Sequence, residues 1–365
     1  MKKHLRKLLA WTCTAAIAAA VLGGCSGGGQ KEAQSTADNN GGTAAESPAA
    51  SAAEPGDMEK LVLKGGCTYS LTSTSYGYAQ AFAEKLKEVS GGMMELEWIG
   101  ASSLGSTSQH YAQLKEGTLD FFSTAFDTTT VLQDGEDFAV CVVPYVFNSM
   151  EHFRKFLDSD LLKGMTEKVE AANNLKFLGS CALNLPRGLS TSKKPIYKPE
   201  DLKGLKIRTP ESPSVTAVWQ AWGANPVQIS VSELFTSLEG GIADGQDNNI
   251  LSMWSNSYYE VQDYYMELEY IQQAQVIWMS GSSWNKLNET QQKWLTEALA
   301  LSEKENSADA LAQYDETKKN LVDAGFEFVD FDREAFVKSA EEVAKGMDGK
   351  LFTAGLYDQI KALDQ

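Results

Sequence analysis

The chain has 365 residues, of which 43% are hydrophobic and 22% charged, so it can bury a substantial core and has no collagen-like, coiled-coil or wholly disordered composition. Its formal charge of −17 argues against a general binder of nucleic acid or anionic membranes, because such partners attract basic surfaces. The only long apolar run lies at the N-terminus, which excludes a polytopic membrane protein.

The N-terminal segment has the layout of a secretory signal. Its basic residues, Lys2, Lys3, Arg6 and Lys7, precede an apolar stretch from Leu8 to Leu22. Leu22-Gly23-Gly24-Cys25 then resembles a bacterial lipobox, in which the cysteine is lipidated after cleavage. We therefore expect a lipoprotein signal peptide at residues 1–24 and a lipid anchor on Cys25; the alternative is a plain signal peptide in which Cys25 is incidental. Residues 25–57 are rich in Gly, Ser and Ala without periodicity, which is typical of a disordered tether.

Three cysteines remain after this segment, an odd number for an oxidising compartment. Cys67, Cys141 and Cys181 allow one disulfide at most. All three have apolar, strand-like surroundings, which favours buried, small hydrophobic side chains.

From Leu61 the chain alternates short apolar strands with amphipathic helices, the pattern of an α/β protein with mostly parallel sheets. The expected strands cover residues 61–69, 94–98, 119–125, 175–182 and 205–208. One expected helix buries Ala79, Phe82, Ala83 and Leu86, and a second covers residues 109–116. A third begins at Ser212-Pro213, and a fourth opens with a capping box at Ser230–Glu233 and ends at Gly240.

A long helical pattern begins at Asn288 and continues without Gly or Pro to Gly325. At 1.5 Å per residue, about 35 residues span about 50 Å, which exceeds one small domain. We therefore expect two α/β lobes, joined by strand crossings and braced by this helix, as in a hinged receptor that forms a cleft.

Several enzyme signatures are absent from the sequence. After signal removal only His110 and His152 remain, and neither belongs to an H-E-x-x-H zinc motif. There is no Walker A loop and no G-x-G-x-x-G fingerprint, and the G-x-S-x-G string at Gly24–Gly28 lacks the strand–turn–helix context of a nucleophile elbow. We expect no metal, no cofactor and no enzymatic activity.

Four motifs follow one another in the middle of the chain. They are Asp201-Leu202-Lys203-Gly204-Leu205-Lys206-Ile207-Arg208-Thr209-Pro210, Gly223-Ala224-Asn225-Pro226, Ser232-Glu233-Leu234-Phe235-Thr236-Ser237-Leu238 and Asp244-Gly245-Gln246-Asp247-Asn248. This series closely resembles the solute receptors of tripartite ATP-independent (TRAP) transporters, the family of C4-dicarboxylate-binding proteins, which carry D-L-K-G-x-K-I-R-x-P, G-A-N-P, S-E-x-Y-x-A-L and D-G-Q-E-N in that order. The resemblance extends from about Leu61 to Phe328. It implies a two-lobed fold of the periplasmic-binding-protein (Venus flytrap) type.

Arg208 lies at the end of an expected strand, where open α/β sheets present ligands, and its guanidinium can grip a carboxylate with two parallel hydrogen bonds. The resemblance implies this role for Arg208. It also implies that Arg187 approaches the same ligand. The amide of Asn248 is implied to help orient Arg208 and the ligand. Val231 and Phe235 stand where the family often has an aromatic residue and a tyrosine, so we expect them in the pocket wall.

Tyr76, after the first strand, and Phe126, after the strand at Leu119, are expected to face Arg208 across the cleft. Simple packing is an equal alternative for both aromatic residues. The pattern of crossings places lobe I at residues 58–183 plus 274–313. Lobe II then comprises residues 184–273 plus 314–365.

The sequence thus predicts a monomeric, lipid-anchored extracytoplasmic receptor that captures a small organic acid. The resemblance implies delivery to a small and a large membrane permease subunit, with uptake driven by an ion gradient. Three alternatives remain: the sugar- or peptide-binding lipoprotein of an ABC-type importer, a cell-surface hydrolase, and a sensor that reports ligand occupancy to a membrane kinase.

Overall fold

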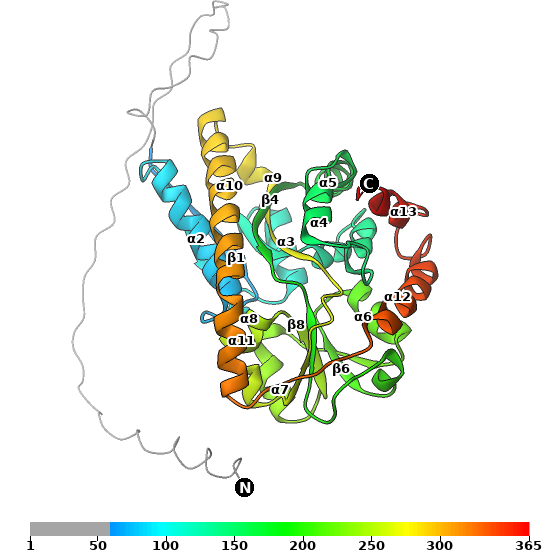
Figure 1. The fold of residues 1–365 in the computed structure, drawn as a ribbon. Coiled ribbons are helices and arrows are strands. Elements are labelled where there is room, and N and C mark those ends of the chain that lie inside the picture. The colour runs from blue at the N-terminus through cyan, green and yellow to red at the C-terminus, as the bar shows by residue number, and fades with distance from the viewer. Residues whose placement is uncertain (1–58, 365) are drawn as a thin grey trace, which may run out of the picture. The chain divides into compact units, whose positions relative to one another are not determined.

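The computed structural model describes residues 59–364. The expected signal peptide (1–24), the lipidated Cys25 and the tether (25–57) lie outside these residues. In the described part, strands and helices alternate as the sequence predicts, and the strands form two sheets, one of five and one of six strands (Figure 1).

The first sheet has the strand order β2-β1-β3-β10-β4. Its strands are β1 (Leu61–Cys67), β2 (Met94–Ile99), β3 (Phe121–Ala125), β4 (Leu175–Asn184) and β10 (Gln273–Ser280). β1 is parallel to both β2 and β3, whereas β10 is antiparallel to β3 and β4. Alternation of buried Met94, Leu96 and Trp98 in β2 confirms the expected half-buried strand.

The second sheet has the strand order β11-β9-β5-β8-β6-β7. Its strands are β5 (Gly188–Thr191), β6 (Lys206–Thr209), β7 (Asn225–Gln228), β8 (Gly245–Asn248), β9 (Tyr264–Met266) and β11 (Glu327–Phe328). β6 is parallel to β7 and β8, so their carboxyl ends meet at one edge, while β5 is antiparallel to β8 and β9.

The expectation of mostly parallel sheets is wrong where the chain crosses between them. β4 carries the chain out of the first sheet, and β10 returns it. These two strands pair antiparallel, with Gln273 opposite Asn184 at one end and Ser280 opposite Leu175 at the other. Both sheets are mixed, because β10 runs antiparallel to its neighbours in the first sheet and β5 does so in the second.

The helices flank the sheets (Figure 1). The α-helices are α2 (Thr74–Val89), α3 (Thr107–Glu116), α4 (Met150–Leu157), α5 (Asp160–Asn173), α6 (Pro213–Ala221), α7 (Leu234–Glu239), α8 (Ile250–Ser255), α9 (Gly281–Trp284), α10 (Glu289–Ala312), α11 (Tyr314–Asp323), α12 (Arg333–Met347) and α13 (Leu356–Ala362). The 3₁₀ helices are η2 (Phe126–Val131), η3 (Glu136–Val142), η4 (Pro199–Leu202), η5 (Val231–Glu233) and η6 (Tyr258–Glu260). α2 buries Ala79, Phe82, Ala83 and Leu86, as expected.

The long helical pattern after Asn288 is interrupted. α10 opens with the capping box of Asn288 and Gln291 and ends at Ala312, and α11 resumes at Tyr314. α10 packs on β4 and α2, whereas α11 packs on α8, so the pair still extends from the first sheet to elements beside the second (Figure 1). The break at Gln313 accompanies this change of packing partner and has no Gly or Pro to mark it.

One further expectation about the helices needs correction. Ser230 does not cap the following helix; its hydroxyl donates to the Glu233 carboxylate at 2.7 Å, and the segment begins as the 3₁₀ turn η5 before α7. The last helix, α13, contacts lobe I, since the backbone carbonyl of Ile360 lies 2.8 Å from Nε2 of His152. This contact joins α13 to a residue of the expected lobe I, although the predicted boundaries assign residues 314–365 to lobe II.

Cys67, Cys141 and Cys181 are buried and unpaired, as small hydrophobic residues would be.

Candidate functional site

A cavity of about 320 Å³ lies where the carboxyl ends of strands from both sheets meet. It is lined by Thr68, Tyr69, Ser102, Ser106, Thr107, Thr124, Ala125, Asp127, Thr128, Arg187, Arg208, Pro210, Glu211, Gln228, Ser230, Val231, Glu233, Asn248 and Gln273. β1 and β3 of the first sheet end at this cavity, as do β6, β7 and β8 of the second. Such strand ends are where open α/β sheets bind ligands.

Arg208, the penultimate residue of β6, is the buried cation of this cavity without a counter-charge. Its side chain is only 3% exposed, and its Nε donates to the carbonyl of Ile229 at 2.9 Å. Among the described residues, no carboxylate lies within ion-pair distance of its guanidinium. Burial lowers the pKa of Arg208, and the more distant carboxylates of Asp247 and Asp127 offset this only in part. An arginine stays protonated even so, which leaves a buried positive charge at the cavity with no carboxylate in direct contact.

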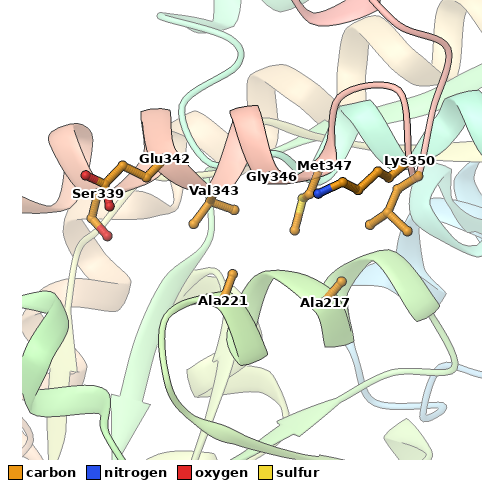
Figure 2. A pocket seen from close by; sticks show the side chains of 9 residues that line it. Ala217, Ala221, Ser339, Glu342, Val343, Gly346, Met347 and Lys350 are labelled. Atoms are coloured by element: carbon orange, nitrogen blue, oxygen red, sulfur yellow. The ribbon is translucent and has the colours of Figure 1, made fainter.

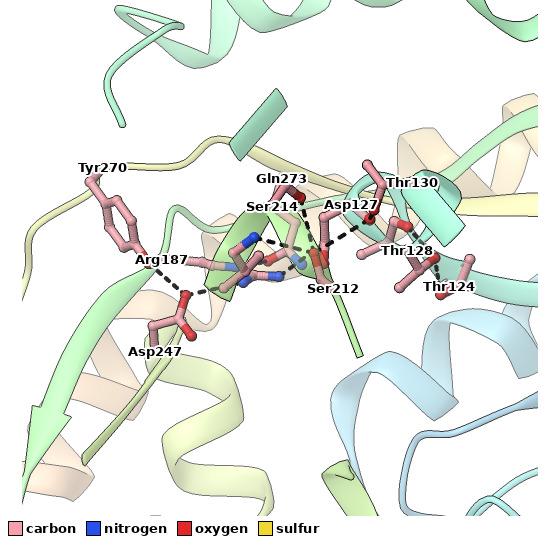
Figure 3. A network of polar contacts seen from close by, with 12 residues as sticks. Thr124, Asp127, Thr128, Thr130, Arg187, Ser212, Ser214, Asp247, Tyr270 and Gln273 are labelled. Carbon is pink, nitrogen blue, oxygen red and sulfur yellow. Dashed lines mark hydrogen bonds and ion pairs between the residues drawn. The ribbon is translucent and has the colours of Figure 1, made fainter. Parts of the chain in front are cut away.

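Arg187, in contrast, is held by two carboxylates (Figure 3). Its Nη1 lies 3.0 Å from Oδ2 of Asp247 and its Nη2 lies 3.4 Å from Oδ1 of Asp127, while its Nε donates to Oε1 of Gln273 at 3.1 Å. Burial alone would lower the pKa of Arg187, but the two carboxylates raise it overall. Tyr270 donates to the same oxygen, Oδ2 of Asp247, at 2.6 Å and so helps to hold that carboxylate.

The backbone beside Arg187 is packed too tightly for a side chain. A Cβ on Gly188 would lie 2.5 Å from the ring of Tyr265 and 2.7 Å from the carbonyl of Met266. Glycine therefore allows β5 and β9 to approach closely, and this approach fixes the position from which Arg187 enters the cavity.

Asn248 and Val231 also line the cavity. The Asn248 amide donates to Oε1 of Gln246 at 2.6 Å, and its backbone carbonyl accepts from Tyr265 at 2.9 Å. The next residue, Asn249, stands where the family often has proline, and its side chain caps α8.

The structure places the other three expected residues elsewhere. Phe126 is 4% exposed, and its ring packs against aromatic rings of the core. Tyr76 is half-buried in a different cluster, where its hydroxyl donates to the carbonyl of Trp98 at 3.2 Å. Phe235 packs against the same cluster. None of the three lines this cavity, so the packing alternative holds for Tyr76 and Phe126.

The sequence reasoning missed three acidic residues at the cavity, Asp127, Glu211 and Glu233. β3 ends at Ala125, and the tight 3₁₀ turn that follows buries Phe126 and brings Asp127 to the cavity. A position just after the end of a strand was therefore a better predictor of a cavity residue than aromatic character. Glu211 follows the motif that contains Arg208, and it accepts from the hydroxyl of Ser108 at 2.5 Å and from its backbone N–H at 3.4 Å.

The contact between Glu211 and Ser108 joins the two sides of the cavity. Ser108 lies in the first turn of α3, which packs on the first sheet, and Glu211 follows β6 of the second. A carboxylate at a helix N-terminus is stabilised by the free N–H groups and the helix dipole. A second contact across the cavity, from Ser232 to Ser102 at 3.5 Å, is longer.

Comparison with protein families settles the class of this chain. Residues 66–350 match the family model DctP, described as bacterial extracellular solute-binding protein, family 7. The chain belongs to this family. Family 7 comprises solute-binding receptors rather than enzymes, and the match favours the TRAP hypothesis over the ABC-type alternative.

Relatives of this family 7 protein agree with the match. The solute-binding protein RD1_1052 of Roseobacter denitrificans is 29% identical over 295 residues, which are 80% of this chain and 89% of the relative. Its crystal structure with bound L-galactonate has a TM-score of 0.75 at 26% identity and covers 85% of this chain and 100% of that one. A TRAP periplasmic solute-binding protein of Citrobacter koseri with bound D-glucuronate has a TM-score of 0.73 at 27% identity, covering 82% and 98%. The C4-dicarboxylate-binding protein DctB of Bacillus subtilis is 26% identical over 73% of this chain and 76% of its own length.

Two other cavities within residues 59–364 lack a buried, unpaired charge of this kind. One of about 360 Å³ lies between α6 and α12 and is lined mainly by small and aliphatic side chains, among them Ala217, Ala221 and Val343 (Figure 2). Another of about 490 Å³ lies beside the crossing segment at Leu183–Pro186. Its charged side chains are paired, as Arg333 is with Glu269.

Within residues 59–364, no cluster of three or more His, Cys, Asp or Glu side chains is arranged to hold a metal ion. None of the helices in this range has the length and apolar character that a bilayer crossing requires.

Proposed function

We propose that this family 7 receptor binds a small organic acid whose carboxylate is held by Arg208. The observation that carries the proposal is the buried, uncompensated guanidinium at a cavity formed by strand ends of both sheets. A buried cation without a counter-ion is costly, and an incoming carboxylate relieves that cost through short, charge-assisted hydrogen bonds. Arg187, whose two carboxylates already balance it, supports the site rather than supplying its free charge.

The relatives support an acid as the ligand. Two related proteins hold L-galactonate and D-glucuronate in their crystal structures, and both molecules carry a carboxylate. The free cation at Arg208 is the feature of this chain that such a group would require. Asn248, Val231 and Gln273 complete the wall beside it.

The receptor would deliver its ligand to the small and large membrane subunits of a TRAP permease. In this proposal it stays at the outer face of the membrane, monomeric and tethered through lipid on Cys25. It performs no covalent chemistry, in line with its family of binding proteins. Contacts that cross the cavity, chiefly Glu211 with Ser108, support closure of the two lobes around the ligand.

A ligand screen with matched arginine variants tests this function. Mono- and dicarboxylates, keto acids and sugar acids are tested by thermal shift, since a ligand that binds only the folded form raises Tm. For any acid that binds, Arg208→Ala should weaken binding by roughly thirty-fold to several thousand-fold, the equivalent of losing one partner of a buried charge pair, about 2–5 kcal/mol. Arg208→Lys should also weaken it, because an ammonium lacks the planar fork.

The control is Arg154→Ala, which removes a half-exposed arginine paired with Glu303 outside the cavity. It should leave affinity unchanged. Arg208→Ala should retain the stability of the ligand-free protein, because it removes a charge that has no protein counter-ion. Absence of binding by every organic acid, or equal affinity for the wild type and Arg208→Ala, would overturn the proposal.

A further inference from the structure

The cavity around Arg208 contains more negative than positive charge. The carboxylates of Asp127, Glu211 and Glu233 line it together with Arg187 and Arg208. Arg187 is already balanced by Asp127 and by Asp247 behind it. Arg208 is therefore the one lining cation left for a ligand carboxylate, and a second ligand carboxylate would find no free cation among the described lining residues.

One carboxylate at this cavity has an acceptor that lacks a donor. Oδ2 of Asp127 is buried without a hydrogen-bond partner, although Oδ1 of the same group binds Arg187. Asp127 is only 3% exposed and lines the cavity. An unsatisfied buried carboxylate oxygen is costly unless a donor approaches it, and a ligand hydroxyl is such a donor.

The remaining wall also suits a hydroxylated ligand. Among the lining residues only Ala125, Pro210 and Val231 lack a polar side-chain group. The others offer hydroxyls, amides and carboxylates, so an aliphatic chain would leave many of these groups without a partner. A chain of hydroxyl groups can both donate to the carboxylates and accept from the hydroxyl side chains.

We infer that the ligand is a hydroxylated monocarboxylate, with its carboxylate on Arg208 and a hydroxyl donating to Asp127, and that Asp127 with Glu233 excludes a second carboxylate. This inference rests on the proposed function, since it assigns the class of acid at the same site. It makes Asp127 a specificity-determining residue that directly contacts the ligand.

Matched sets of acids test the inference by titration calorimetry on the full-length protein. A six-carbon set comprises D-galactonate, L-galactonate, D-gluconate, galactarate, adipate and hexanoate, and a four-carbon set comprises erythronate, threonate, tartrate, succinate and butyrate. Within one set, chain length is constant while hydroxyl groups and the second carboxylate vary. We expect the best hydroxylated monocarboxylate to bind at least tenfold more tightly than its diacid and its unhydroxylated counterpart. A diacid or an unhydroxylated acid that binds as tightly or more tightly overturns the inference.

Variants of the two acidic residues test whether they cause the preference for a monocarboxylate over a dicarboxylate. Asp127→Asn should reduce the preference for the monoacid over the diacid at least three-fold, because it removes the charge that faces the second carboxylate. Glu233→Gln tests the same point in a residue outside the buried ion pairs, should Asp127→Asn fail to fold. Glu269→Gln, whose carboxylate pairs with Arg333 away from this cavity, is the control and should leave the preference unchanged.

Failure of the inference differs from failure of the proposed function. If diacids bind best and Arg208→Ala abolishes that binding, the receptor function stands and the inference is wrong. If no acid binds in an Arg208-dependent way, both are wrong. An unchanged preference in both Asp127→Asn and Glu233→Gln would remove these two residues from the explanation and overturn their assigned role.

Discussion

Replacing Arg187 by methionine would distinguish a structural from a ligand-binding role. The side chain is buried and lies between the carboxylates of Asp127 and Asp247, at 3.4 and 3.0 Å. Methionine retains much of the volume but leaves both carboxylates without their cation. Breaking a buried ion pair by removal of one partner costs about 3–5 kcal/mol. The unfolding entropy is about 2.1 cal/mol/K per residue, so for the roughly 300 described residues this loss of stability corresponds to a decrease in Tm of about 5–8 °C.

Urea denaturation and differential scanning calorimetry of the ligand-free protein measure this loss. A triple variant that also carries Asp127→Asn and Asp247→Asn should recover part of it, because it no longer buries unpaired carboxylates. Arg333→Met, which breaks an exposed pair with Glu269, is the control and should cost about 1 kcal/mol or less. If Arg187→Met left stability intact but abolished ligand binding, Arg187 would be a ligand contact and our reasoning about the network would be refuted.

Three further predictions concern closure, thiol reactivity and pH. Glu211→Gln should weaken ligand binding several-fold in calorimetry, because a neutral amide is a poorer partner for the N-terminus of α3. Ser108→Ala should cause the same loss, and the double variant should lose no more than either single variant; additive losses would contradict the contact. Burial raises the pKa of the Cys67 thiol to about 12, so it should resist maleimide at pH 8 in the folded protein and react in guanidinium chloride; rapid native labelling would show that this strand opens. Burial lowers the pKa of His110 below 6.5 despite its hydrogen bond with the Ser106 carbonyl, so its contribution to stability is complete above pH 6.5 and is lost as the pH falls toward the folded-state pKa. His110→Gln should therefore flatten the pH dependence of the denaturation midpoint below pH 6.5, and an unchanged slope would contradict this.

The sequence predicted the elements that local chemistry determines. Hydrophobic spacing placed α2, and Ser212-Pro213 placed the start of α6. The position of Arg208 at a strand end was also predictable, because its motif ends an apolar strand immediately before Thr209-Pro210. These features depend on near neighbours in the chain.

Features set by distant contacts were not predictable in the same way. The break at Gln313 follows from packing on different partners and carries no local signal. Phe126 is buried in the core, and Asp127 lines the cavity in its place, because a 3₁₀ turn follows β3 directly. The pairing of Arg187 with Asp127 and Asp247 joins residues 60 positions apart on either side, which spacing alone does not reveal.

A crystal structure of the full chain with the organic acid that raises Tm most would test the role of Arg208 most directly. We predict that both carboxylate oxygens of the acid lie within about 3 Å of the guanidinium nitrogens of Arg208, while Arg187 keeps its two carboxylate partners. A bound acid whose carboxylate is held by other groups, with Arg208 out of contact, would contradict the account.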